Sequence, residues 1–179
     1  MSFAYPEGWL RSILTFYSTL QQQGRDVYKI VMGSQHTVIV DDKFDVYTFG
    51  LGDLGQLGHS NRVSCHKPKA IELLPSILHN TTTSNQQRSN AKYSMYSSLH
   101  NIPVKDLCCG RDHTLLLTSH GKVYSWGDNR RGQLGHSHFD CASTPRLVTA
   151  PYLHTITAIC AGAYHSGALS EAGVGYVWG

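Results

Sequence analysis

Histidine and cysteine are the residue types in this sequence that most directly suggest chemistry. The 179 residues include 11 histidines and 5 cysteines, and imidazole and thiolate groups are the usual ligands of zinc. Three histidines, His36, His113 and His165, recur at the same repeat position, each three residues after a glycine. Ligands of one ion must converge on it, whereas one histidine per repeated unit indicates a hydrogen bond, such as one to a turn, made in every unit. We therefore predict structural histidines, with no metal site, catalytic residue or cofactor.

The cysteines are also expected to be structural. Cys108 and Cys109 are adjacent, a spacing that suits neither a compact disulfide framework nor a CxxC zinc site. Small residues before Gly110 and Gly162 indicate closely packed strands, although a reactive thiol or a metal role remains an alternative. Because the N-terminus makes a poor signal peptide, we expect reduced thiols and an intracellular chain, cytoplasmic or nuclear.

Internal repetition is the strongest signal in the sequence. A shift of 77 positions aligns residues 55–60, GQLGHS, with residues 132–137, and a shift of 52 positions aligns Gly110 with Gly162. The unit is therefore about fifty residues long. The recurring residues are Gly33, His36, Gly50, Gly55, Gly58, Gly110, His113, Trp126, Gly127, Gly132, Gly135, Gly162, His165, Trp178 and Gly179.

The repeated units read as short β-strands. Runs of aliphatic and aromatic residues at 115–118 and 123–126 flank a turn signal at 119–122, which predicts a hairpin, and residues 38–40 and 46–49 repeat the design. The expected divisions are an N-terminal segment at 1–29, with a possible short helix at 9–20 packing against the first unit; a first repeat at 30–78; a polar, disordered insert at 79–101; a second repeat at 102–155; and a third, cut in mid-unit, at 156–179.

Three motif blocks carry a family resemblance. Residues 107–117 (LCCGRDHTLLL), 121–127 (GKVYSWG) and 132–135 (GQLG) resemble the repeat of the regulator of chromosome condensation family. The resemblance implies a β-propeller, seven-bladed in the parent protein, so the expected fold is all-β, a partial and open propeller. Since two and a half repeats cannot close a ring, we expect a fragment whose open edge is covered by missing repeats or by a partner chain.

Binding is the function that these features favour. Loop positions differ between copies while the glycine frame is constant, so candidate contacts are Asp53, Asp128, Asn129, Arg130 and Arg131, with plain solvated turns as the alternative. We predict a protein–protein interaction module and not an enzyme. The resemblance also implies an alternative, guanine nucleotide exchange on a small GTPase such as Ran. Scattered basic residues and a net charge of +3 make nucleic acid an unlikely partner, and no membrane partner is expected.

Overall fold

The computed structural model describes residues 7–71, 103–149 and 155–179, so the predicted polar insert at 79–101 lies outside the described residues. One helix and eleven strands are found in this part of the chain. They are α1 (Glu7–Gln22), β1 (Val27–Met32), β2 (His36–Asp41), β3 (Val46–Gly50), β4 (Cys65–Ala70), β5 (Val104–Cys109), β6 (His113–Thr118), β7 (Val123–Gly127), β8 (Ala142–Leu147), β9 (Ile156–Ala161), β10 (Ser166–Ser170) and β11 (Gly175–Trp178).

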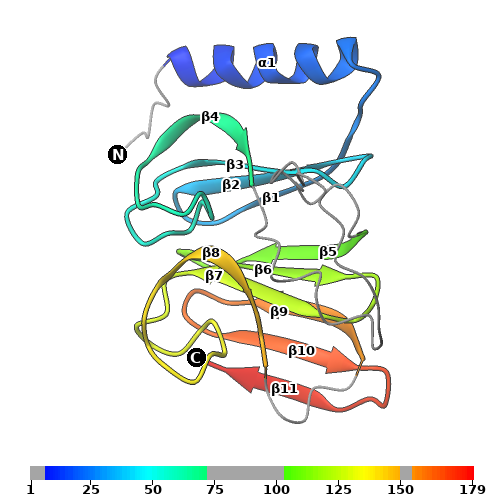
Figure 1. Cartoon of the computed structure of the whole chain (residues 1–179), viewed down its shortest axis with the longest axis vertical. Coiled ribbons are helices and arrows are strands. Elements are labelled where there is room, and N and C mark those ends of the chain that lie inside the picture. The colour runs from blue at the N-terminus through cyan, green and yellow to red at the C-terminus, as the bar shows by residue number, and fades with distance from the viewer. Residues whose placement is uncertain (1–6, 72–102, 150–154) are drawn as a thin grey trace, which may run out of the picture.

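The strands form three antiparallel sheets that are stacked as propeller-type blades (Figure 1). Blade 1 is β1–β4, blade 2 is β5–β8 and blade 3 is β9–β11, with each strand paired to its neighbour in sequence. The first strands of the blades approach one another, β1 against β5 and β5 against β9. The described part of the chain is therefore all-β apart from α1 and forms an open row of blades.

Strand position within each blade follows from residue type. The second and third strands of blades 1 and 2, such as β6 and β7, are mostly buried, in keeping with their β-branched, aliphatic and aromatic residues. In blade 3 the third strand, β11, is exposed or half-buried. The outer strands β4 and β8 contain Pro68 and Pro145. Proline cannot donate to a ladder and is tolerated at a sheet edge, so these two polar segments form outermost strands that the hydrophobic pattern did not predict.

Two hydrophobic cores lie between the blades and not inside any single one. In the first, Val38, Val40 and Val46 of blade 1 pack with residues of blade 2 that include Trp126. In the second, Leu115 and other residues of blade 2 pack with blade 3. Burying apolar surface contributes about 25 cal/mol per Å², so each blade depends on its neighbour for stability.

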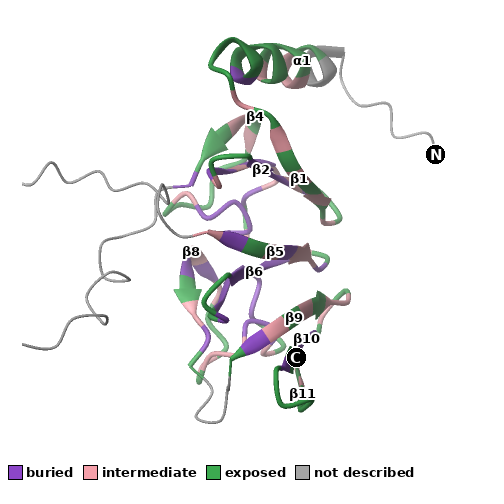
Figure 2. Cartoon of the chain, turned by 90° about the vertical axis from the view of Figure 1, so that its right-hand side faces the viewer, coloured by how far each residue is buried: buried purple, intermediate pink, exposed green. Residues whose placement is uncertain are grey.

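Helix α1 lies on the side of blade 1 that faces away from blade 2 (Figures 1 and 2). The ring of Phe16 meets that of Tyr47 edge to face, with 4.8 Å between centroids, and Leu20 is buried. The helix occupies the stretch in which a helix was expected and is slightly longer. Within the described residues, no helix has the length and apolar character needed to cross a membrane.

Candidate interaction surface

The repeated histidines join each blade to the next. His36 Nε2 lies 3.0 Å from Thr114 Oγ1, and His113 Nε2 lies 2.9 Å from Ser166 Oγ. Both imidazoles are buried. Their partner is a hydroxyl on the strand of the following blade, which corrects the expectation that the imidazole bonds to a turn in each blade.

The tautomer of His113 follows from its partner. Ser166 Oγ donates its hydrogen to the carbonyl oxygen of Gln133, 2.7 Å away, so it accepts the hydrogen of His113 Nε2. Nδ1 of His113 is buried without a hydrogen-bond partner among the described residues. Burial lowers the pKa of both His36 and His113 to about 4, so both rings are neutral at pH 7.

Tryptophan makes the second link between blades. Trp126 Nε1 donates to the carbonyl oxygen of Gln56 at 3.0 Å, and Trp178 Nε1 donates to that of Gln133 at the same distance. In each pair the glutamine belongs to the GQLG block of the preceding blade. A Cβ on Gly135 would lie 2.8 Å from Nε1 of Trp178, so this block needs its second glycine for the indole to approach.

The first strands of adjacent blades approach most closely where the repeated glycines stand. A Cβ on Gly110 would lie 2.6 Å from the carbonyl oxygen of Gly162 in the next blade. Backbone hydrogen bonds run between the same loops, from Ser34 N to Arg111 O at 2.9 Å and from Arg111 N to Ala163 O at 3.1 Å. The small residues expected to allow close packing therefore lie at a blade–blade contact.

The cysteines of β5 are part of this packing. All five cysteines of the chain are free thiols. Burial raises the pKa of Cys108 and of Cys109 to about 12, so both stay protonated at neutral pH and are poor nucleophiles. No group of three His, Cys, Asp or Glu side chains able to hold a metal ion occurs within residues 7–71, 103–149 and 155–179.

Two kinds of loop meet at one end of the blades, which we call the loop face. His36 pairs with Gly50, and His113 pairs with Gly127, so the loop before the second strand lies beside the loop after the third. Backbone hydrogen bonds join them, for example Asp128 N to Asp112 O at 2.8 Å. The loop face consists of residues 33–35, 51–64, 110–112, 128–141 and 162–164.

Two of the five predicted contact residues are buried in this end of the molecule. Asn129 donates from Nδ2 to His138 O at 2.6 Å and accepts from Leu134 N at 3.0 Å. Asp128 is held by Arg130, whose Nε donates to Oδ1 at 2.8 Å. Burial opposes ionisation of Asp128, but the hydrogen bonds from Arg130 outweigh it and keep the pKa of Asp128 below its usual value. Both residues shape the loop and do not present a contact, which corrects their predicted role.

The other three predicted residues are exposed on the loop face. Asp53 and Arg130 occupy equivalent positions in blades 1 and 2, so the charge reverses between the copies. Asp53 accepts a hydrogen bond from Gln56 Nε2 at 3.2 Å. Arg131 lies with its guanidinium carbon 4.7 Å from the ring centroid of Tyr164 in blade 3.

Tyr164 and Arg111 complete this cluster and were missed by sequence reasoning. Arg111 approaches the Tyr164 ring at 5.6 Å and donates from Nη1 to its hydroxyl oxygen at 2.5 Å. Tyr164 therefore contacts two guanidinium groups, a favourable arrangement for cation–π attraction. The available signal was the variable pair inside each Gly-x-x-His block, Ser-Gln, Arg-Asp and Ala-Tyr in turn.

Carboxylates next to the cluster give the loop face a mixed charge. Arg111 Nε lies 3.4 Å from Asp112 Oδ2. Burial, with a smaller effect from the Asp128 and Asp53 carboxylates, raises the pKa of Asp112. Alternating charges of this kind suit the polar rim of a protein–protein interface.

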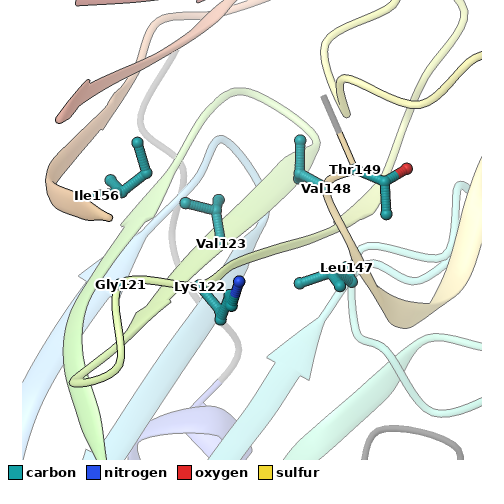
Figure 3. A pocket seen from close by; sticks show the side chains of 7 residues that line it. All are labelled: Gly121, Lys122, Val123, Leu147, Val148, Thr149 and Ile156. Carbon is teal, nitrogen blue, oxygen red and sulfur yellow. The ribbon is translucent and has the colours of Figure 1, made fainter. Parts of the chain in front are cut away.

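A pocket of 180 Å³ lies at the opposite end of the blades (Figure 3). It is lined by Val123 after the β6–β7 turn, by Leu147 and Val148 at the end of β8, and by Ile156 at the start of β9. Lys122 is the one charged side chain of its lining. Gly121 and Thr149 complete the lining, which combines aliphatic side chains with polar groups.

Two family models of the regulator of chromosome condensation (RCC1) repeat match the chain. One matches residues 45–82 and 120–169, and the second matches residues 104–133. Together they cover more than half of the chain. The match at 120–169 runs from the β6–β7 turn to β10, so the sequence repeat is offset from the blade and spans two blades.

Relatives in sequence and structure agree with this match. The chain is 31% identical to the ultraviolet-B receptor UVR8 of Arabidopsis thaliana over 87% of its length and 30% of the receptor, and 32% identical to the RCC2 homolog of Danio rerio over 90% of its length and 33% of the relative. It thus spans about a third of these proteins.

Among solved structures, human WBSCR16 aligns with a TM-score of 0.65 at 20% identity, covering 86% of this chain and 33% of that one. Yeast RCC1 (Prp20), solved bound to Kap60, aligns with a TM-score of 0.62 at 21% identity, covering 86% and 32%. A second Prp20p structure, from a study that also addressed its binding to Gsp1p and histones, aligns equally well. The chain belongs to the regulator of chromosome condensation (RCC1) repeat family.

Proposed function

We propose that the chain is a protein–protein interaction module that binds its partner through the loop face. The observation that carries this proposal is the cluster of Arg111, Arg131 and Tyr164, whose residues stand at variable positions of a repeated frame. Arginine and tyrosine are the residue types that most often dominate binding energy at interfaces. A constant frame with variable loops is the usual arrangement of a recognition surface.

The frame beneath these loops supports the proposal because it holds them in place. Histidine and tryptophan hydrogen bonds join each described pair of adjacent blades, and backbone hydrogen bonds join the loops directly. A preorganised surface loses less conformational entropy on binding than a flexible one. The role is binding and involves no covalent step, and a cytoplasmic or nuclear location remains part of the proposal.

A second candidate function is guanine nucleotide exchange on a small GTPase. It is favoured by the structural similarity to Prp20p, a protein studied for its binding to Gsp1p. Exchange requires only that the nucleotide-free GTPase be bound more tightly than the nucleotide-bound form. It is therefore a special case of binding, and the same chain can be tested for both.

Binding measurements on two partner classes test the proposal. We would titrate a Ran-type GTPase and a core histone dimer against the wild-type chain and against Arg111→Glu/Arg131→Glu. The matched control is Lys105→Glu/Lys122→Glu, which reverses two exposed charges at the other end of the blades. We expect at least one partner to bind and the arginine variant to weaken binding by about tenfold or more, since hot-spot residues cost about 2 kcal/mol or more.

Three results distinguish the outcomes. Equal weakening by the two double variants would indicate general electrostatics and contradict a loop-face site, as would the absence of binding to both partners. Release of a fluorescent GDP analogue from the GTPase, accelerated by the wild-type chain, would establish exchange. Binding of the GTPase without faster release of the GDP analogue would support the interaction module and reject the exchange-factor hypothesis.

A further inference from the structure

A pair of aromatic rings lies at the end of blade 1 opposite the loop face. Tyr28 belongs to β1, and Phe44 belongs to the turn between β2 and β3, which lies beside the connection from α1 to β1 (Figure 1). The two ring centroids are 5.8 Å apart, with an angle of 72° between the ring planes. Tyr28 is 55% exposed and Phe44 is half-buried. We call these two side chains the aromatic corner.

Phe44 has a backbone conformation that phenylalanine rarely adopts. Its φ is 64°, and the equivalent residues are Gly121 of blade 2 and Gly173 of blade 3, with φ of 72° and 78°. This left-handed region is unfavourable for a bulky side chain. Strain of this kind is concentrated at functional sites. The phenyl ring therefore points to a role beyond closing the turn, which glycine performs in the other blades.

Among the three described blades, the aromatic corner occurs in blade 1 alone. Lys105 stands at the position of Tyr28 in blade 2. A Cβ on Gly121 would lie 2.5 Å from Cγ2 of Thr155, so blade 2 has no room for a ring at the position of Phe44. Lys105 is exposed although blades 1 and 3 stand on either side of its own blade. The exposure of Tyr28 is thus a property of its position within the blade.

Two exposed carboxylates belong to the segments that carry the aromatic corner. Asp26 directly precedes β1, and Asp42 belongs to the same turn as Phe44. Asp42 N donates to Asp26 O at 2.8 Å, and Asp26 N donates to Asp42 Oδ1 at 3.2 Å. Asp42 also pairs with Lys43 at the surface, at 3.3 Å. Asp26 makes no ion pair within the part of the chain that the structure describes, so its negative charge is available to a ligand.

A basic side chain is the ligand that suits this arrangement. The face of an aromatic ring attracts a cation, and nearby carboxylates add to that attraction. Among the described residues, arginine lies over the ring of Tyr164, and no lysine or arginine lies over Tyr28 or Phe44. We propose that the aromatic corner binds a lysine or arginine side chain of a partner protein.

Titration of the full chain with a hexalysine peptide tests this proposal. The dissociation constant is measured from the amide NMR resonances of residues 26–29 and 41–45, so the readout is local to the aromatic corner. Tyr28→Leu removes the ring but keeps an apolar side chain, and we expect it to weaken binding about threefold or more. Tyr28→Phe keeps the ring and is expected to bind hexalysine as tightly as the wild type.

Phe44→Gly tests the second ring. Glycine is the residue of the other two blades at this position and suits the left-handed backbone, so we expect the variant to fold. Its affinity for hexalysine should fall about threefold or more, because one wall of the corner is lost. The matched control is Tyr17→Leu, which removes another exposed tyrosine, 42% exposed on α1, and should leave the affinity unchanged.

Three results would overturn the proposal. The first is that hexalysine leaves these amide resonances unshifted. The second is equal affinity of Tyr28→Leu and the wild type, which would show that the carboxylates act without the rings. The third is equally strong binding of a hexaglutamate peptide. If circular dichroism shows that Phe44→Gly does not fold, the comparison of Tyr28→Leu with Tyr28→Phe decides. Neither the GTPase nor the histone dimer is used, so the result is independent of binding at the loop face.

Discussion

The buried histidines His36 and His113 are the residues whose protonation state affects the contacts between blades. His36 and His113 act as neutral hydrogen-bonding groups between blades. Each ring also has a buried Nδ1 without a partner among the described residues. Protonation would place a charge in a buried site, and the Asp128 carboxylate offsets this cost at His113 only in part, so the links that join the blades depend on pH.

Acidification is predicted to weaken the fold between pH 6.5 and pH 4. The unfolded chain protonates its imidazoles near pH 6.5, whereas His36 and His113 resist protonation until about pH 4. The unfolded state therefore binds more protons in this window, and the free energy of unfolding falls as pH falls, by on the order of 3 kcal/mol for each histidine. Urea titrations at several pH values measure this slope.

A variant separates these histidines from the others in the chain. His113→Gln keeps an amide donor near Ser166 but cannot titrate, so the free energy of unfolding should depend less steeply on pH than in the wild type. His120→Gln, in the exposed β6–β7 turn, is the control and should leave the slope unchanged. A slope that is the same in His113→Gln as in the wild type would show that His113 does not resist protonation.

At the same scale, sequence reasoning identified the histidine position and its structural nature but not its partner. Thr114 and Ser166 lie 78 and 53 residues away along the chain from the histidines they meet. Only the stacking of blades brings them together, and periodicity does not specify that geometry. The same reason explains why Tyr164 and Arg111 were missed, since their contact joins blades 2 and 3.

At the scale of elements, the main constraint is the close approach of the first strands of adjacent blades. β5 passes β9 where Gly110 faces the backbone of Gly162. The His113 ring also lies against Gly110. We predict that Gly110→Ala lowers the free energy of unfolding by about 2 kcal/mol or more, because its methyl group would meet atoms that cannot move freely. Chemical denaturation of the purified variant measures this loss.

Gly175→Ala is the matched control for that substitution. No atom lies within 4 Å of a Cβ built on Gly175, and its backbone is not in the positive-φ region. We expect this variant to be as stable as the wild type or slightly more stable, since alanine restricts the unfolded chain. Equal losses at the two glycines would mean that the blade–blade approach is not limiting.

Element prediction succeeded where burial imposes a pattern. The central strands β2, β3, β6 and β7 contain the aliphatic and aromatic runs from which hairpins were predicted. The outer strands β4 and β8 are polar and contain proline, so neither alternation nor composition marks them. These segments become strands because they pair with the neighbouring strands β3 and β7, so their structure depends on the tertiary context.

At the largest scale, the described part of the chain is a row of blades whose stability lies in the interfaces between them. Hydrophobic cores, histidine links and tryptophan links all connect neighbouring blades. An arrangement of this kind resembles repeat proteins in which nearest-neighbour contacts dominate. It leaves the loops free to vary, which is why a binding role suits the loop face better than the pocket at the other end.

Hydrogen–deuterium exchange of the chain with a bound partner tests this account most directly. With the histone dimer or the GTPase bound, the account predicts slower exchange at residues 110–112, 128–131 and 162–164, which carry the arginine and tyrosine cluster. It predicts no change at the turns of the opposite end, residues 119–122 and 171–174. Protection confined to those turns, with the loop face exchanging as in the free chain, would contradict the assignment of the loop face as the binding surface.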